Sequence, residues 1–401
     1  MTRNWQNYLI TGVTFLGVWL LAAMLTGQAN LGFDSYYNSF SLQAEAWLHG
    51  RLDLGRDYEW LELAIVDGRY YVSFPPFPSV VMLPLAAVFG ANTPDTLVAL
   101  LVALLGLYHA VALAEDCLPD AKHAPLWALY LLLGNGYLFL CMNGWVWFIA
   151  QSMCFTLSLA AIHHAVRGRG GWALAAWAAS VGCRPMAVLL GPLLLWVLWQ
   201  DLRGKNPQAK PGQLLRKRLH WAAAPTALAV FYMALNWARF GNPLEFGHNH
   251  LPEFQQYGAQ FALSYIPQNL VQLFSLPALS QDGRLLLPSM DGGCAWLLNP
   301  MLWTALAAWV WGVKERRGGW TLWLLPVSIA AYLLVILSHR TLGAWQFGNR
   351  YLVDLMPWLY FGALIHQGGK GVAFAKCTAP LAVVGIALHF FGTVAVYNMW
   401  M

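Results

Sequence analysis

The segment YLITGVTFLGVWLLAAMLT, from Tyr8 to Thr26, carries no charged residue and sets the fold class. A hydrocarbon core about 30 Å thick takes roughly 20 apolar residues per helical crossing, so this segment predicts a membrane-spanning helix. Similar stretches recur along the chain, and 59% of the 401 residues are hydrophobic while 10% are charged. An average soluble protein is about 25% charged. The sequence therefore predicts a single all-α membrane domain, residues 1–401, that crosses the bilayer many times.

Apolar segments of sufficient length predict about 11 to 12 transmembrane helices. The segment Pro78–Gly90 is shorter than the ~17 residues that a crossing needs, so we expect a re-entrant or partial helix there. Arg184 and Pro185 interrupt a longer apolar stretch, and we expect a tight outward turn between two spans at this point. The expected spans are residues 8–26, 96–114, 124–141, 146–165, 171–183, 186–200, 220–237, 299–313, 320–338, 351–366 and 377–399.

The placement of Lys and Arg, which outnumber Asp and Glu by 23 to 18, predicts the orientation. Because cytoplasmic loops carry an excess of Lys and Arg, we expect the basic clusters at residues 201–219 and 314–317 to lie inside. The first apolar segment has no cleavage pattern and is expected to be retained, with the N-terminus in the cytoplasm. We expect a multi-pass protein of the inner (plasma) membrane. The basic residues do not form one stripe, so no nucleic-acid partner is expected.

Two long segments, residues 28–77 and 238–298, are expected on the outward face. In the first, residues 35–49 alternate an apolar face with a polar line that includes Asn38 and Glu45. This pattern predicts an amphipathic helix lying flat on the membrane, with its polar line facing a ligand or water. Asp67 and Gly68 then separate two short runs, residues 63–66 and 69–73, and this dipeptide favours a type I′ turn. A small β-hairpin is predicted.

Six motifs in these outward segments and helix ends carry a family resemblance. They are NSFSLQAEAWLHGRL (Asn38–Leu52), DGRYYVSFPPFP (Asp67–Pro78), GWVWFIAQ (Gly144–Gln151), GCRP (Gly182–Pro185), NWARFGNPLEFG (Asn236–Gly247) and WQFGNRYLVDLMPW (Trp345–Trp358). Together they resemble bacterial members of the GT-C superfamily, the multispanning glycosyltransferases related to the protein O-mannosyltransferases and the lipid A aminoarabinose transferases. The motifs span most of the chain.

The resemblance implies a GT-C-like fold and an inverting transfer of a sugar from a polyprenyl-phosphate donor to a hydroxyl group at the outer face. The acceptor would be a glycan, a lipid or a protein, with membrane lipids around it. An acidic residue after the first span would act as general base; Asp34 occupies the matching position, and Glu45 is the second candidate. Asp34 also lies where the loop helix needs an N-cap, and Asp is a preferred cap.

Outward arginines are the expected phosphate ligands, because a planar guanidinium donates two hydrogen bonds at once. Arg184 lies at membrane depth, where charged side chains are usually functional, although it can also snorkel to the interface or pair with a carboxylate. Arg350 is also a candidate phosphate ligand, but Asp354 at i+4 could form an intrahelical ion pair with it instead. Arg51 and Arg69 can reach a lipid phosphate or simply be solvated.

The motifs supply further substrate-binding candidates, although each has a plainer reading. Tyr70 and Tyr71 would stack on a sugar ring, but interfacial belts also account for tyrosines. Glu245 belongs to a segment that also makes an ordinary turn. His248 and His250 form an isolated H-x-H pair, and the chain has no D-x-D, so neither a metal nor a cofactor is expected. The remaining candidates in the motifs are Asn38, Gln346, Asn349 and Asp354.

Two other functions are compatible with the sequence. A transporter or flippase of a lipid-linked substrate is one, but such folds commonly pair two broken helices, and the sequence shows a single interruption at Arg184 and Pro185. A non-catalytic membrane protein on the same scaffold is the other, because fold does not fix function.

Overall fold

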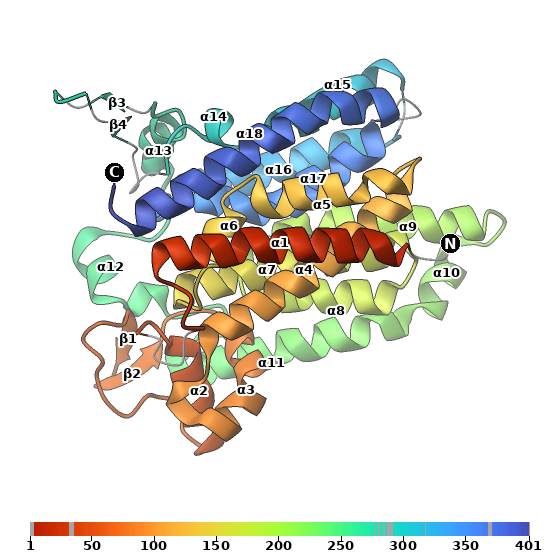
Figure 1. The fold of residues 1–401 in the computed structure, drawn as a ribbon. Coiled ribbons are helices and arrows are strands. Elements are labelled where there is room, and N and C mark those ends of the chain that lie inside the picture. Colours follow the sequence, from red (N-terminus) through yellow and green to blue (C-terminus); the bar gives the residue numbers. More distant parts are fainter. Residues whose placement is uncertain are drawn as a thin grey trace.

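The computed structural model describes residues 4–31, 36–276, 278–279, 281–283, 285–286, 292–316, 318–367 and 371–400. Its helices run side by side in one bundle (Figure 1). The main helices are α1 (Trp5–Thr26), α4 (Asp95–Cys117), α5 (Ala124–Leu133), α7 (Val146–Val166), α8 (Gly170–Val181), α9 (Gly191–Lys205), α11 (Ala223–Phe240), α15 (Pro300–Lys314), α16 (Thr321–Ser338), α17 (Met356–His366) and α18 (Gly371–Tyr397).

Shorter elements join these helices. The α-helices are α2 (Ser39–Leu48), α3 (Phe77–Phe89), α6 (Tyr137–Leu140), α10 (Pro211–Lys217), α12 (Pro252–Tyr257), α13 (Ile266–Gln272) and α14 (Ala295–Leu298). The 3-10 helices are η1 (Gly90–Asn92), η2 (Ala121–His123), η3 (Pro185–Leu190), η4 (Leu219–Ala222), η5 (His248–His250), η6 (Leu263–Tyr265) and η7 (Arg350–Leu355). Two antiparallel strand pairs are β1 (Leu63–Val66) with β2 (Arg69–Val72) and β3 (Ala278–Leu279) with β4 (Leu285–Leu286).

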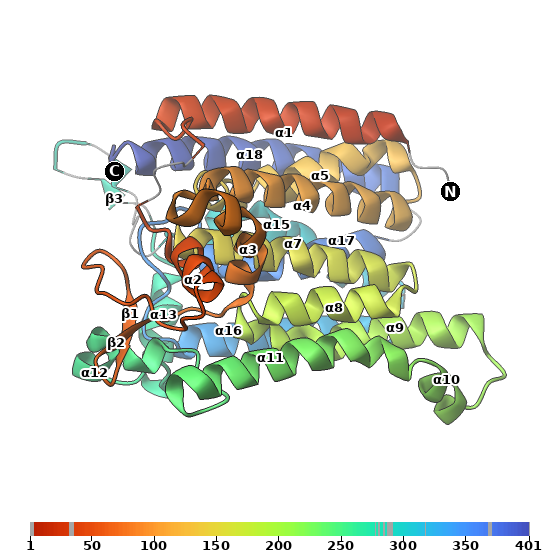
Figure 2. The same cartoon turned by 90° about the horizontal axis from the view of Figure 1, so that it is seen from below.

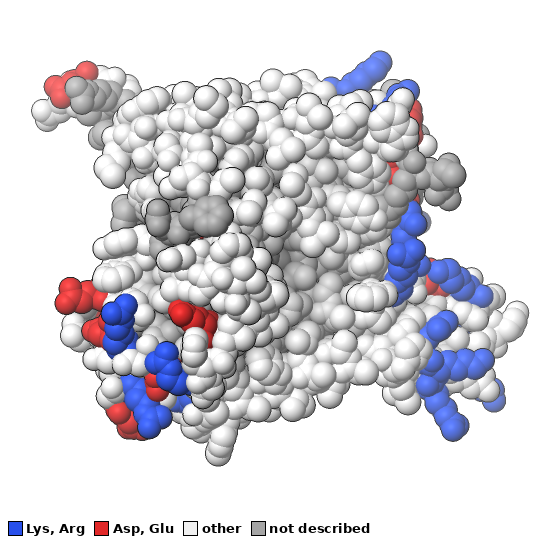
Figure 3. Space-filling view, turned by 60° about the horizontal axis from the view of Figure 1, so that its bottom comes forward, with Lys and Arg blue, Asp and Glu red and all other residues white. Residues whose placement is uncertain are grey.

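The two ends of the bundle differ. The loop end carries α2, β1, β2 and α12, whereas the basic end carries the N-terminus and α10 (Figure 2). Lys and Arg gather at the basic end, mixed charges lie at the loop end, and the surface between them is uncharged (Figure 3). Such a belt suits a bilayer. The basic cluster at residues 201–219 and the N-terminus share one end, as expected; the side of the membrane on which that end lies stays a prediction.

The prediction that the chain contains membrane-spanning helices is confirmed. Within the described residues, 6 helices are long and apolar enough to cross a membrane: Trp5–Thr26, Asp95–Cys117, Val146–Val166, Pro185–Lys205, Thr321–Ser338 and Lys376–Tyr397. The chain is therefore a mostly helical, multi-pass membrane protein. The count of about 11 to 12 spans stays a prediction, because several expected spans form shorter helices here.

The expected span 124–141 is divided into α5 and α6. Asn135 causes the division, because its side-chain Oδ1 accepts a hydrogen bond from the Tyr137 backbone N–H at 2.9 Å while its amide donates to Leu131 O. Such local side-chain bonds compete with the helical ladder. Gly134 adds to the break, since a Cβ there would lie 2.7 Å from Tyr130 O.

The segment expected to be re-entrant forms α3, which does not traverse the bundle. The Leu97 backbone N–H, at the start of α4, donates to Leu31 O, just beyond α1, at 3.1 Å. The chain between these residues therefore leaves and returns at the loop end. The predicted β-hairpin is also confirmed: Val66 pairs with Arg69, and both turn residues have positive φ, 49° at Asp67 and 68° at Gly68.

Helix α2 confirms the predicted loop helix, but its surroundings correct the expectation that it lies flat on the membrane. Most of its apolar residues are buried, although Leu48 is exposed, and the polar residues Ser41 and Gln43 are buried too. Ser41 Oγ donates to Asp95 Oδ1 at 2.5 Å, and Ser79 Oγ donates to Gln43 Oε1 at 2.8 Å. The helix is thus packed between α3 and the start of α4, because these polar side chains find partners inside the protein.

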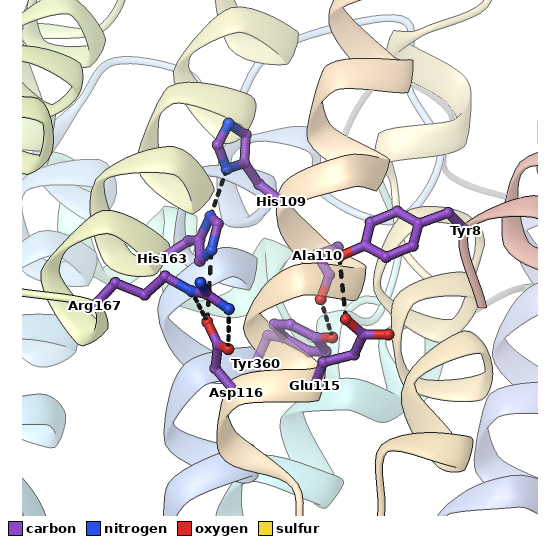
Figure 4. Close-up of polar contacts among 8 residues, drawn as sticks. All are labelled: Tyr8, His109, Ala110, Glu115, Asp116, His163, Arg167 and Tyr360. Atoms are coloured by element: carbon purple, nitrogen blue, oxygen red, sulfur yellow. Dashed lines mark hydrogen bonds and ion pairs between the residues drawn. The ribbon is translucent and has the colours of Figure 1, made fainter. Parts of the chain in front are cut away.

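A polar network ties α1, α4 and α7 together at the basic end (Figure 4). Arg167 donates from Nε and Nη2 to the two oxygens of Asp116, both at 2.6 Å. His163 Nε2 lies 3.5 Å from Asp116 Oδ2, and its Nδ1 lies 2.9 Å from His109 Nδ1. Tyr8 donates to Glu115 at 3.2 Å. These contacts fix the register of three long helices, because a paired charge in this position is stable only in one arrangement.

Candidate functional site

Arg184 lies at the turn where α8 gives way to η3. Its backbone is extended, with φ −141° and ψ 102°, because Pro185 disfavours a helical conformation in the residue before it. Gly182 precedes it, and a Cβ there would collide with the hydroxyl of Tyr232. The predicted tight turn is therefore present, and it directs Arg184 into the bundle, where 19% of its side chain stays exposed.

The guanidinium of Arg184 is held through its Nε atom. Its Nε donates to Asp354 Oδ2 at 3.1 Å, and the Tyr332 hydroxyl donates to the same oxygen at 2.8 Å. The carboxylate thus positions Arg184, and the predicted alternative, an arginine paired with a carboxylate, is formed here. Within the described residues, however, Arg184 Nη2 and Asp354 Oδ1 have no hydrogen-bond partner. A buried donor without a partner is costly, so Nη2 is suited to an anionic ligand.

Arg350 begins η7 and is positioned by its own motif. Its backbone N–H donates to Gln346 Oε1 at 2.7 Å, and Asn349 has the left-handed φ of 60° that redirects the chain. Gly343 lies against the guanidinium, because a Cβ there would be 2.5 Å from Arg350 Nε. Arg350 is buried, with 7% of its surface exposed, yet this Nε has no hydrogen-bond partner in the described part of the chain.

The two guanidinium groups flank one aromatic ring. The Cζ atom of Arg184 lies 4.9 Å from the centroid of Tyr351, and that of Arg350 lies 5.3 Å from it. Asp354 is paired with Arg184 rather than with Arg350, so the intrahelical pair between Arg350 and Asp354 is not formed. The reason is that η7 is a 3-10 helix, which does not bring residues i and i+4 together as an α-helix does. Of the two guanidinium groups, Arg184 is thus the one that Asp354 pairs with among the described residues.

A further carboxylate, that of Glu62, interacts electrostatically with this group, and no motif in the sequence pointed to it. Trp147 Nε1 donates to Glu62 Oε2 at 2.9 Å, and the Ser73 hydroxyl donates to the backbone oxygen of Glu62 at 2.9 Å. Burial raises the pKa of Glu62, while the bond from Trp147 and the charge of Arg350 lower it. Arg350 therefore acts electrostatically on Glu62, and we call Arg184, Arg350, Tyr351, Asp354 and Glu62 the arginine site.

Two neutral histidines border the arginine site. Burial, together with the charge of Arg184, lowers the pKa of His248 to about 4 and that of His339 to about 4. At neutral pH they add no charge beside the arginines. Within the described residues, no group of three or more His, Cys, Asp or Glu side chains is arranged to hold a metal ion.

Comparison with known proteins gives a match only at the level of structure. No family model matches the chain, and neither does any curated protein. Two crystal structures of ArnT from Cupriavidus metallidurans, one bound to undecaprenyl phosphate and one in the apo state, match it with a TM-score of 0.54 each. In both, 97% of this chain and 76% of ArnT are covered, at 16% sequence identity. The chain has the fold of ArnT, a GT-C aminoarabinose transferase. The resemblance to the GT-C superfamily is thereby confirmed for the fold.

The GT-C fold separates the predicted site residues into two groups. Arg184, Arg350 and Asp354 meet in the arginine site. Asn38, Glu45 and Arg51 instead line a cavity of about 750 Å³ at the loop end, which we call the loop cavity. The second candidate base is thus in the loop cavity and not beside the arginines. The first candidate base, Asp34, lies outside the described residues.

The other predicted ligands contact protein groups. Gln346 and Asn349 are buried, and their amides donate to the backbone oxygens of Leu342 and Gly293, respectively. Glu245 accepts hydrogen bonds from Gly247 N and Asn249 Nδ2, both at 2.6 Å, and so closes its own turn. On the hairpin, Arg69 is exposed, Tyr70 is half-buried, and Tyr71 is buried with its ring 5.7 Å from that of Phe240.

Proposed function

We propose that this protein is an inverting glycosyltransferase that moves a sugar from a polyprenyl-phosphate donor to an acceptor hydroxyl at the outer face of the membrane. The observation that carries the proposal is the pair of buried guanidinium groups, each with an N–H that has no partner in the described structure. The fold shared with ArnT, which binds undecaprenyl phosphate, supports the same class of ligand.

The donor phosphate would lie between Arg184 Nη2 and Arg350 Nε. Charge-assisted hydrogen bonds from guanidinium groups to phosphate oxygens are short and strong, and a low-dielectric setting strengthens them further. Asp354 and Tyr332 are positioning residues in this scheme, because Asp354 holds the Nε of Arg184 and Tyr332 donates to the same carboxylate oxygen. The two arginines would offset the negative charge that builds on the phosphate as it leaves.

We propose Glu62 as the general base, because it is a carboxylate of raised pKa that Trp147 holds by a hydrogen bond. The acceptor oxygen would attack the anomeric carbon of the sugar while the bond from that carbon to the phosphate oxygen breaks. The hydroxyl proton would pass to Glu62, and the polyprenyl phosphate would leave with the bonding electron pair. A base with a raised pKa accepts this proton more readily. Asp34 and Glu45 remain the bases that the family resemblance implies.

The outer face is proposed from charge. Lys and Arg gather at the basic end (Figure 3), whereas Gly182, beside the turn at Arg184, accepts a hydrogen bond at 3.0 Å from the backbone N–H of Phe77 at the start of α3. We infer that the arginine site lies toward the loop end. An excess of Lys and Arg marks the cytoplasmic side of membrane proteins. The loop end would then face outward, toward an acceptor glycan, lipid or protein.

Transfer by the reconstituted full-length protein tests the proposal. The assay would measure release of undecaprenyl phosphate from a set of synthetic undecaprenyl-phosphate sugars in the presence of membrane extracts that contain the acceptor. We expect Glu62→Gln to lower the rate by about 100-fold or more, the usual contribution of a general base. Glu59→Gln, which changes an exposed residue on the same loop, is the matched control.

Asp34→Asn and Glu45→Gln would be measured beside it. Full activity in Glu62→Gln together with loss in either of these variants would move the base to that residue. Absence of release from every donor by the wild-type protein would contradict the assignment as a transferase.

A further inference from the structure

The loop cavity is distinct from the arginine site. It lies at the loop end, where α2, the end of η1 and residues 51–60 meet, and it measures about 750 Å³. Pockets for small ligands commonly have volumes of about 300–1,000 Å³. Its lining residues are Tyr36, Asn38, Leu42, Glu45, His49, Arg51, Leu54, Gly55, Arg56, Tyr58, Trp60 and Ala91.

One wall of the loop cavity is aromatic. The rings of Tyr36 and Trp60 are stacked with centroids 5.3 Å apart, and Tyr58 meets Trp60 edge-on at 5.7 Å. Trp60 is 44% exposed and Tyr36 is 57% exposed. Large aromatic side chains gathered on an accessible loop commonly mark an interaction site.

Other residues that line the loop cavity are polar or charged. Glu45 comes from α2, His49 caps the C-terminal end of that helix, and Arg51 lies two residues further on. Arg51 lies across Gly55, whose φ of 73° and missing side chain leave room for the guanidinium. Among the described residues, no hydrogen bond or ion pair is formed by the carboxylate of Glu45 or by the guanidinium of Arg51. Both are therefore available to a ligand.

We propose that the loop cavity binds a sugar ring of the acceptor. That the bound sugar belongs to an acceptor rests on the proposed function. A pyranose presents apolar C–H faces and a rim of hydroxyl groups. The aromatic wall fits the faces, and a carboxylate with a guanidinium fits the rim, because hydroxyl groups both donate and accept hydrogen bonds. An aliphatic ligand would leave Glu45 and Arg51 desolvated without partners.

A chain of contacts connects the loop cavity to the arginine site. The ring of Tyr36 contacts that of Tyr37 at 5.2 Å, and Tyr37 contacts Trp147 at 4.9 Å. Trp147 then donates to Glu62. Tyr37 and Trp147 therefore link the lining of the loop cavity to Glu62, where an acceptor hydroxyl group would react under the proposed function. The loop cavity would select the acceptor, and the arginine site would carry out the transfer.

Binding of free oligosaccharides tests this inference without any lipid donor. Full-length protein in nanodiscs would be applied to an array of defined, lipid-free bacterial oligosaccharides. We expect binding to a subset of uncharged members, and we expect Trp60→Ala to weaken it by about tenfold, the upper end of what one aromatic contact contributes. Glu45→Gln should also weaken binding. Trp237→Ala and Glu59→Gln change exposed residues outside the lining and are the controls.

Absence of binding to every member of the array would overturn the inference. So would binding that is unchanged in both Trp60→Ala and Glu45→Gln, and so would binding restricted to phosphorylated or carboxylated members, which would indicate an anion site at Arg51. Because the array contains no polyprenyl phosphate, failure here would leave sugar transfer at the arginine site untouched. Failure of transfer with intact array binding would instead remove the proposed function.

Discussion

At the scale of single residues, the arginine site shows which roles a sequence can indicate. Arg184 and Arg350 stand out in the sequence because charged side chains beside apolar spans are rare. The partner of Arg184 does not, since Asp354 lies 170 positions away and local spacing points to Arg350 instead. Glu62 is one of several acidic residues in its loop, and nothing but the fold distinguishes it from the exposed Asp57 and Glu59.

The pH dependence of transfer follows from Glu62. Its pKa is raised by burial, and a general base works only when deprotonated, so the rate should fall as the pH drops through this raised pKa. The hydrogen bond from Trp147 lowers the pKa, so Trp147→Phe should move the acid limb of the kcat/KM profile to higher pH. Trp172→Phe, at an exposed site, is the control. An acid limb that stays in place would show that Glu62 is not the base.

His339 makes a separate prediction about stability. Burial lowers its pKa from 6.5 to about 4 in the folded protein. Between about pH 6.5 and pH 4, the unfolded chain therefore binds a proton at this residue that the folded chain does not bind. Stability should fall between pH 6.5 and pH 4, by at most about 3 kcal/mol from this residue. His339→Asn should flatten that part of a Tm-versus-pH curve, while His220→Asn, an exposed control, should not. An unchanged slope in His339→Asn would contradict the lowered pKa.

At the scale of elements, local chemistry was predictable and long-range packing was not. The β-hairpin and the turn at Arg184 follow from Asp67-Gly68 and from Pro185, whose conformational preferences act on their neighbours. The division of α5 from α6 was missed because residues 124–141 read as one apolar run, and the side-chain bonds of Asn135 decide it. The burial of α2 was missed because the partners of Ser41 and Gln43 lie in other elements.

The network at the basic end predicts how α4 and α7 are held together. Asp116→Leu removes both acceptors of Arg167, which keeps 27% of its side chain exposed and can regain some hydration. We expect a loss of about 1 to 3 kcal/mol, the range for removing a partner from a partly buried charged pair. A thermal unfolding midpoint in detergent measures it. Asp120→Asn, which breaks an exposed pair with Lys122, should change the midpoint little, and equal effects of the two variants would contradict the account.

At the scale of the whole molecule, the apolar belt and the unequal charges of the two ends define how the protein sits in a bilayer. Composition and charge placement indicated both features in advance, and the motif order indicated a fold that the chain shares with ArnT at 16% sequence identity. Identity of the sugar and of the acceptor does not follow from these features. The reason is that specificity depends on a few side chains, whereas the fold depends on the pattern of the whole chain.

The orientation of the molecule is open to direct labelling. On a Cys377→Ser background, which removes an exposed thiol, Asp57→Cys at the loop end should react with a membrane-impermeant maleimide added to intact cells. Gln208→Cys, near α10 at the basic end, should react only after the membrane is opened. The reverse pattern would place the arginine site on the cytoplasmic side.

Binding of undecaprenyl phosphate to the purified full-length protein tests the central claim most directly, because it depends on the arginine site and not on the unknown sugar. Arg184→Gln and Arg350→Gln should each weaken binding by about tenfold or more, the equivalent of one charge-assisted hydrogen bond. Arg216→Gln, an exposed change on α10, should bind as the wild type does. Equal affinity in all four proteins would contradict the claim that these two guanidinium groups hold the lipid phosphate.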